Sequence, residues 1–196
     1  MLYLQIDHFN VANLHNLTEV GFWVIFGAIC MFTFIMPVLS LNMMKNAYVI
    51  SDWEVSNHKE RVPLLITSAV FLCCLYYMFT YLESNSGSIF ENFFSVLMGG
   101  IILATLAAII SHFWKISLHA MMISALAGAM IGLTATMSPI INKEEMVLYN
   151  SILLLIVGIV GFARLHQKAH NILQVLAGMA LGFSVMFVVV NQEWYI

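Results

Sequence analysis

The chain has 196 residues, of which 62% are hydrophobic and only 9% are charged, and its formal net charge is −3. About 25% of the residues in a soluble globular domain are charged, so this composition excludes an ordinary soluble protein, and it also excludes disordered, collagen-like and disulfide-scaffold classes. The few Lys and Arg residues are scattered rather than gathered in a stripe, which argues against nucleic acid as a partner because that binding needs many phosphate contacts.

The N-terminal segment, residues 1–19, mixes apolar side chains with Asp7, His8 and His15. This amphipathic pattern predicts a segment that lies in the membrane interface, with a plain solvated tail as the alternative. Residues 20–196 are expected to form one domain of transmembrane helices.

Six uncharged apolar stretches follow, and each has about the 17 to 25 residues that a helix needs to cross a bilayer. They are Val20–Leu41, Val62–Leu82, Phe93–Ile110, Ile116–Met137, Met146–Ala163 and Ile172–Val190. The first stretch is too long and lacks the basic flank of a cleaved signal peptide, so we expect a retained helix with Pro37 near its end. The predicted fold class is therefore all-α, an integral membrane six-helix bundle.

Two of these stretches carry glycines four residues apart. Gly128 and Gly132 lie in the fourth stretch, and Gly178 and Gly182 lie in the sixth. Small residues at this spacing let two helix backbones approach closely, so the fourth and sixth helices are expected to pack against each other.

Polar residues collect in the first, third and fifth loops, which six spans would place on the same side of the membrane. That side carries every Lys and Arg except Lys143, and every His except His8 and His15. The positive-inside rule would put this side in the cytoplasm. Charges that only anchor helices at lipid headgroups are the alternative interpretation. The residues concerned are Lys45, Asp52, Glu54, His58, Lys59, Glu60 and Arg61, then His112, Lys115 and His119, then Arg164, His166, Lys168 and His170.

Spacing around the fifth loop carries the most specific signal. Ala163-Arg164 is followed by five residues, His170, three residues and Gln174, which puts His170 and Gln174 one turn apart on a helix face. This pattern resembles the third motif of the type 2 phosphatidic acid phosphatase (PAP2-like) membrane superfamily, Ser-Arg-x5-His-x3-Asp.

Two earlier segments resemble the other motifs of that family, in the same order and on the same side. Ile116-Ser117-Leu118-His119 is similar to the second motif, Pro-Ser-Gly-His, at the start of a helix. Lys59-Glu60-Arg61-Val62-Pro63 echoes the first motif, Lys-x6-Arg-Pro, with a different spacing.

The resemblance implies a membrane lipid-phosphate phosphatase that acts on phosphatidate, phosphatidylglycerol phosphate or an isoprenyl diphosphate. By the family pattern, His170 is the nucleophile that forms a phosphohistidine, and His119 is the acid that protonates the leaving alkoxide. Arg164 and Arg61 would hold the phosphate, assisted by Lys59, Lys115 and Ser117. Neither a metal nor another cofactor would be required.

The sequence departs from the family at three positions. Gln174 stands where the family has an Asp that supports the nucleophile, Leu118 replaces a Gly, and Ala163 replaces a Ser. Gln still accepts a hydrogen bond but brings no negative charge. The alternative function is therefore a catalytically degenerate relative that binds lipid phosphate or serves as a membrane partner subunit.

Two other functions, a metal site and a transporter, are alternative interpretations of this sequence. Four imidazoles at one side could hold a metal ion, although the basic residues of the fifth loop would repel a cation; the histidines are His112, His119, His166 and His170. A transporter is the second alternative, but many transporters are built from internal repeats and this chain shows no clear one.

The expected location is the cell (inner) membrane as a multi-pass protein, with membrane lipids as surroundings and a membrane protein as a further partner under the subunit alternative. Members of the resembled family commonly face the site away from the cytoplasm, whereas the charge count favours the cytoplasm, so both orientations stay open.

Overall fold

The structure is a computed structural model, and it describes residues 19–53, 55, 57–86, 91–136 and 143–194. The described part is helical, with no strand. Its elements in chain order are α2 (Glu19–Cys30), the π-helical segment η3 (Met31–Ile35), α3 (Met36–Asn46), α4 (Arg61–Ser86), α5 (Glu91–Phe113), α6 (Leu118–Thr136), α7 (Lys143–His166) and α8 (Ile172–Asn191). The predicted interfacial segment lies almost entirely outside the described residues.

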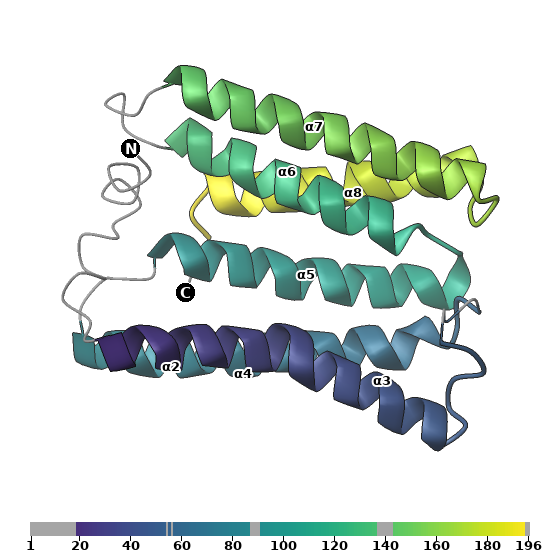
Figure 1. Ribbon diagram of the computed structural model, residues 1–196, viewed down its shortest axis with the longest axis horizontal. Coiled ribbons are helices and arrows are strands. Elements are labelled where there is room, and N and C mark those ends of the chain that lie inside the picture. The colour runs from purple at the N-terminus through teal and green to yellow at the C-terminus, as the bar shows by residue number, and fades with distance from the viewer. Residues whose placement is uncertain (1–18, 54, 56, 87–90, 137–142, 195–196) are drawn as a thin grey trace.

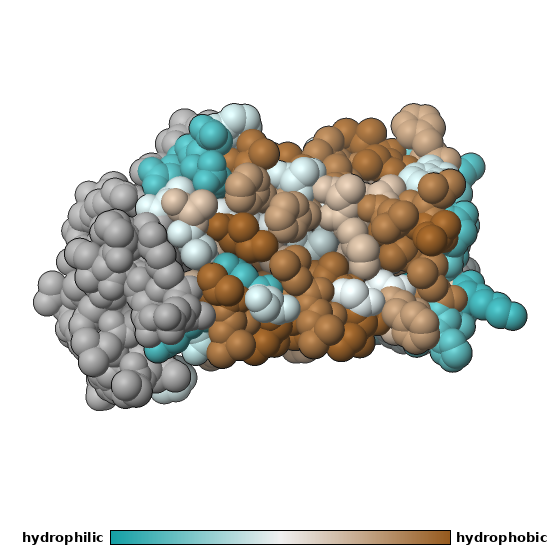
Figure 2. Space-filling view, turned by 90° about the horizontal axis from the view of Figure 1, so that it is seen from above, coloured by the Kyte–Doolittle hydropathy of each residue, from teal (hydrophilic) through white to brown (hydrophobic). Residues whose placement is uncertain are grey.

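Six helical spans of the described chain are long and apolar enough to cross a membrane, and the first of them runs continuously through α2, η3 and α3. The prediction of an all-α, six-helix integral membrane bundle is therefore confirmed, and the protein is a multi-pass membrane protein. Figure 2 shows an apolar surface over the middle of the molecule with hydrophilic residues toward its two ends. This distribution is the one that a hydrocarbon core flanked by two aqueous interfaces requires.

The first span is less regular than the sequence predicts. The backbone N–H of Met36 donates to the carbonyl of Met31, five residues back, where an α-helix would reach back four. Pro37, which follows directly, has no N–H to continue the α-helical ladder, and its ring would crowd the carbonyl four residues earlier. The π turn accommodates the proline without ending the helix.

Two clusters hold the bundle together. The first joins α4 to α5 through buried side chains on which the first span packs; it contains Leu75, Phe79, Phe94 and Leu97. The second joins α5, α6 and α8; it contains Leu103, Ala107, Met121, Ala125, Ala129, Leu133, Met186 and Val190. Helix α7 lies against α6 and α8 (Figure 1), and much of its surface is exposed to the surroundings.

Helices α6 and α8 form the closest pair, as the glycine spacing predicts. A Cβ atom added at Gly178 would lie 2.7 Å from the carbonyl oxygen of Ser117. One added at Gly182 would overlap the carbonyl oxygen of Met121, and one at Gly128 would overlap that of Phe183. Glycine is therefore required at these positions because the opposing atoms are backbone and cannot rotate away.

We expect Gly182→Ala to lower the free energy of unfolding by about 1 to 3 kcal/mol, because the new methyl group forces α6 and α8 apart. Thermal unfolding of the purified protein in detergent would measure the change. Gly158→Ala is the matched control, since an added Cβ at Gly158 meets nothing within 4 Å. Equal midpoints for the two variants would contradict the close approach.

Candidate active site

The ends of α3, α5 and α7 and the starts of α4, α6 and α8 lie at one end of the bundle (Figure 1), so the first, third and fifth loops share that end. The common side that six spans predict is thus observed. The candidate site residues named from the sequence belong to these loops or to the first turns of the helices that follow them, except Arg164, which lies in the last turn of α7.

A direct backbone contact joins the second and third motifs. The backbone N–H of Ser117 donates to the carbonyl oxygen of Gln174 at 3.2 Å. The contact is available because Gly178, one turn farther along α8, lets the start of α6 lie against that helix. Residues far apart in the chain therefore meet at the adjoining N-terminal ends of two helices.

His170 lies buried just before α8 and contacts Gln174. Its Nδ1 atom is 3.1 Å from Gln174 Oε1, and the same oxygen accepts the backbone N–H of Asn171 at 3.2 Å. Asn171 Oδ1 in turn accepts the backbone N–H of Gln174 at 2.9 Å, which completes a capping box at the start of α8. The one-turn spacing of His170 and Gln174 thus produces the predicted hydrogen bond.

The surroundings of His170 keep its imidazole neutral. Burial is the main cause that lowers its pKa to about 4, and the positive charges of Arg61, Lys115 and Arg164 lower it further. The hydrogen bond with Gln174 acts in the opposite direction and raises the pKa. At neutral pH the ring is therefore unprotonated at one nitrogen, the state that a nucleophile needs.

Arg61 is anchored where α4 begins. Its side chain is only 8% exposed, its Nε donates to the carbonyl oxygen of Val55 at 2.8 Å, and Nη1 donates to that of Ile116 at 3.2 Å. Val55 has a φ of 49°, a left-handed conformation that a β-branched residue rarely adopts. Arg61 thereby ties the first loop to the third.

Arg164 and Ser117 carry polar atoms without protein partners. Arg164 donates from Nη1 to Gln167 Oε1 at 3.0 Å, while its buried Nε has no hydrogen-bond partner. Ser117 is 0% exposed and its Oγ is likewise unpartnered. Arg164 is also close enough to Arg61 for the two positive charges to repel each other. An oxyanion bound between the two guanidinium groups would relieve the repulsion.

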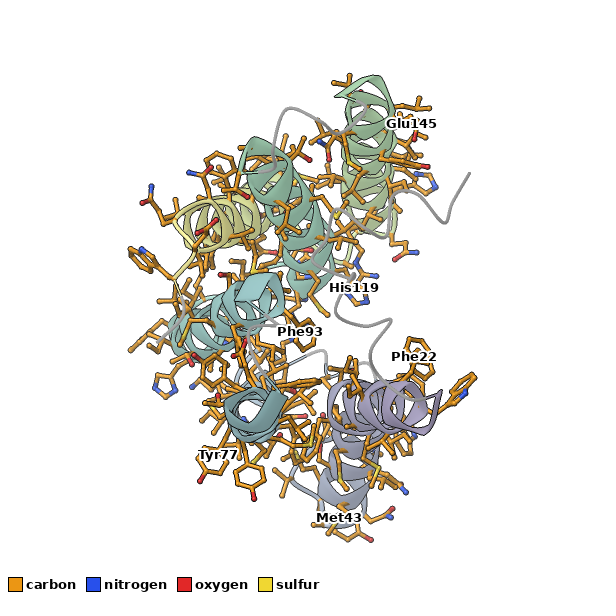
Figure 3. All side chains as sticks on the ribbon, turned by 90° about the vertical axis from the view of Figure 1, so that its left-hand side faces the viewer. Phe22, Met43, Tyr77, Phe93, His119 and Glu145 are labelled. Carbon is orange, nitrogen blue, oxygen red and sulfur yellow. The ribbon has the colours of Figure 1, made fainter. Side chains whose placement is uncertain are left out.

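His119 projects from the first turn of α6 and its side chain is exposed. It is near enough to Arg164 and Arg61 for both charges to act on it. Figure 3, which looks along the helices, shows His119 near the middle of the bundle, whereas the labelled Tyr77 and Met43 lie at its edge. The accessible imidazole of His119 therefore lies near the same two charges, those of Arg61 and Arg164, that act on His170; we call this group the charged neighbourhood.

Two of the four histidines that a metal site would use pack on exposed aromatic rings instead. His166 stacks on the exposed ring of Phe162 with a centroid distance of 5.9 Å, and His112 contacts the exposed ring of Phe113 at 4.8 Å. Over the described residues, no three His, Cys, Asp or Glu side chains come together as a metal site would require. The metal alternative thus lacks a common ligand cluster.

The two lysines differ in position. Lys115 is partly buried and its charge acts on His170. Lys59 is exposed, and its backbone N–H donates to Asn57 Oδ1 at 3.2 Å. Its neighbour His58 attaches this loop to α5 through Nδ1, 2.7 Å from the carbonyl oxygen of Ser111. The phosphate-binding role of both lysines stays a prediction.

Sequence reasoning missed Asn171 and the backbone carbonyls that hold Arg61. Asn171 could have been found, because Asn followed three residues later by Gln before an apolar run is the pattern of a capping box. The carbonyls of Val55 and Ile116 leave no such pattern, since any residue supplies a carbonyl.

Residues 110–196 match the model of the PAP2 superfamily. The resemblance predicted from the second and third motifs is therefore confirmed for this part of the chain, and it indicates phosphatase-type activity on phosphorylated substrates. The match does not include Lys59 or Arg61, so their assignment to a first motif stays a prediction. No curated protein and no solved structure shows a significant match to the chain.

We expect His170 to titrate near pH 4 rather than near pH 6.5, because burial disfavours its charged form. Between these pH values the unfolded chain binds the proton and the folded chain does not, so the contribution of His170 to stability falls as the pH drops from 6.5 to about 4. NMR of ¹⁵N-histidine-labelled protein would follow the titration, with His170→Gln to assign the signal. A midpoint at or above pH 6.5 would contradict the expectation.

We expect Arg61→Lys to reduce stability by about 1 to 3 kcal/mol, because an ammonium group cannot reproduce the two guanidinium hydrogen bonds and leaves a buried carbonyl unpaired. Chemical unfolding in detergent would report the loss. Lys59→Ala, in the exposed part of the same loop, is the control. If both variants unfold like the wild type, Arg61 does not hold the loops together.

Proposed function

We propose that this protein is a membrane lipid-phosphate phosphatase that removes phosphate from phosphatidate, phosphatidylglycerol phosphate or an isoprenyl diphosphate through a phosphohistidine. The observation that carries the proposal is a neutral, buried His170 that is held by Gln174 and surrounded by the positive charges of Arg61, Lys115 and Arg164. The family match over residues 110–196 supports the same reaction class.

The basic residues supply the charge that a phosphate dianion requires. Arg164 has an unpartnered Nε, and Ser117 has an unpartnered hydroxyl. A guanidinium group can hold two phosphate oxygens at once, while Lys115 and Lys59 would act as point charges at the rim. Arg61 uses two of its five N–H donors on carbonyl groups, which fixes its position and leaves three donors and its positive charge for a phosphate.

In the first chemical step, the Nε2 lone pair of His170 attacks phosphorus and the bond from phosphorus to the lipid oxygen breaks. His119, acting as an imidazolium, gives its proton to the leaving alkoxide. In the second step, neutral His119 takes a proton from water, the resulting oxygen attacks phosphorus, and the P–N bond breaks to release phosphate. Both histidines return to their starting states.

Gln174 supports this chemistry less strongly than a carboxylate would. Its Oε1 lies 3.1 Å from His170 Nδ1 and can accept a hydrogen bond from it, but this oxygen offers no negative charge to the imidazolium that forms during attack. In a serine protease triad, replacing the supporting Asp by Asn costs about 10⁴ in rate, partly through the wrong tautomer. We therefore expect slow turnover.

The chemistry needs no metal ion, because the arginines neutralise the phosphate oxygens.

The second candidate function is that of a degenerate relative that binds lipid phosphate or serves as a membrane partner subunit. The neutral Gln174 and the bulk of Leu118, at a position where the family has Gly, favour this candidate. Such a protein would keep the positive charges of Arg61 and Arg164 for binding but would not turn over a substrate.

Six membrane spans and a site at the ends of the helices fit a substrate whose tail lies in the bilayer and whose headgroup reaches the interface. We propose the cell (inner) membrane as the location. Labelling of a cysteine introduced at Asn46, in a background without Cys30, Cys73 and Cys74, would decide which side the site faces. Labelling from outside intact cells would place it away from the cytoplasm.

We expect purified protein in detergent to release phosphate from at least one of the three substrates with EDTA present. His170→Ala should lower the rate by at least about 10³-fold because it removes the nucleophile. Gln174→Asp should raise the rate by about tenfold or more, since a carboxylate stabilises the imidazolium. His166→Ala is the control, because His166 stacks on Phe162 at the outer surface.

Turnover that survives His170→Ala or disappears with EDTA would overturn the proposal. A silent wild type that still binds phosphatidate vesicles, with binding weakened by Arg164→Ala, would favour the degenerate binder.

A further inference from the structure

The side chain of Gln174 has two ends of opposite character, and only one of them supports His170 as a nucleophile. Its Oε1 accepts hydrogen bonds, whereas its amide nitrogen donates them. If the amide nitrogen faced His170 Nδ1, that ring atom would have to be an acceptor and the proton would move to Nε2. An Nε2 that carries a proton has no lone pair with which to attack phosphorus.

The start of α8 resolves which end faces the ring. The backbone N–H of Asn171 points at the Gln174 side chain, at 3.2 Å from Oε1, and a backbone N–H can only donate. The atom that receives it must therefore be the oxygen. The same oxygen lies 3.1 Å from His170 Nδ1, so Nδ1 must carry the proton and Nε2 must be free.

The Asn171 side chain holds this arrangement in place. Its Oδ1 accepts the backbone N–H of Gln174 at 2.9 Å, and its own backbone is extended, with φ −85° and ψ 168°, as an N-cap requires. This bond fixes the first turn of α8, from which the Gln174 side chain reaches back. Loss of the cap would let that turn fray and the amide rotate.

We propose that Asn171 is a positioning residue that fixes the Nδ1–H tautomer of His170 by orienting the side-chain amide of Gln174. The inference rests on the proposed function for its effect on turnover, while the tautomer itself is a property of the resting protein. A carboxylate at position 174 would accept through either oxygen and would not need orienting. The requirement for Asn171 therefore arises from the neutral Gln174 of this chain.

The first test reads the tautomer by NMR of ¹⁵N-histidine-labelled protein in detergent at pH 7, with His170→Gln for assignment. We expect Nδ1–H in the wild type, a mixture of tautomers in Asn171→Ala, and Nδ1–H again in Asn171→Ser, because Ser is a good N-cap. An Nε2–H wild type, or an unchanged tautomer in Asn171→Ala, would overturn the inference.

The second test measures phosphate release from phosphatidate. Asn171→Ala should lower kcat by up to about tenfold, because only molecules with the Nδ1–H tautomer have a free Nε2 lone pair, with KM changed less than twofold, and Asn171→Ser should restore kcat. In a Gln174→Glu background the same Asn171→Ala change should cost less than threefold, because no amide has to be oriented. Equal losses in both backgrounds would mean that Asn171 acts only on stability, and would overturn the inference.

The two tests separate this inference from the proposed function. If the wild type shows no turnover on any substrate but the tautomer responds to Asn171→Ala and Asn171→Ser as expected, the positioning role stands and the phosphatase proposal fails. If turnover is observed and the tautomer does not respond, the phosphatase proposal stands and the positioning role fails.

Discussion

The close approach of α6 and α8 is the constraint on which the candidate site depends. Gly178 lies against the carbonyl of Ser117, and Gly182 lies against that of Met121, so no side chain separates the two backbones. Lipid tails are as apolar as the helix surfaces, and helices in a bilayer therefore associate through such tight packing. This packing brings Ser117 of the second motif against the first turn of α8, where its backbone N–H donates to the carbonyl oxygen of Gln174.

Electrostatics at this end of the bundle combine concentrated positive charge with a neutral imidazole. Arg61 and Arg164 repel each other, and both lower the pKa of His170. The hydrogen bond with the neutral Gln174 raises the pKa of His170 only in part, and the negative charge of a carboxylate at that position would raise it further. Under the proposed function, this arrangement would favour binding of a phosphate anion and attack by an unprotonated nitrogen, but it would stabilise the developing imidazolium weakly. Binding and turnover are therefore expected to diverge in this protein more than in a relative that retains the Asp.

The first loop contributes to the site through backbone atoms rather than through a motif. Arg61 donates to the carbonyls of Val55 and Ile116, and His58 contacts the carbonyl of Ser111. These bonds fasten the first loop and the start of α4 to the end of α5 and to the residues just before α6. Val55, His58 and Arg61 themselves lie outside the segment that matches the PAP2 superfamily. The N-terminal half thus adds the charge of Arg61 to those of Lys115 and Arg164 from the C-terminal half.

The sequence by itself determined the six spans, their common polar side, the pairing of α6 with α8 and the contact of His170 with Gln174. Hydrophobic length, glycine spacing and one-turn spacing are local properties, so a single sequence reveals them. The tertiary structure alone decided that Arg61 is buried between two loops, that His112 and His166 face outward beside Phe113 and Phe162, and that Gln174 presents its oxygen to His170. These features depend on backbone carbonyls and N–H groups brought together from distant parts of the chain. Every residue carries such groups, and no sequence pattern marks the ones that will meet.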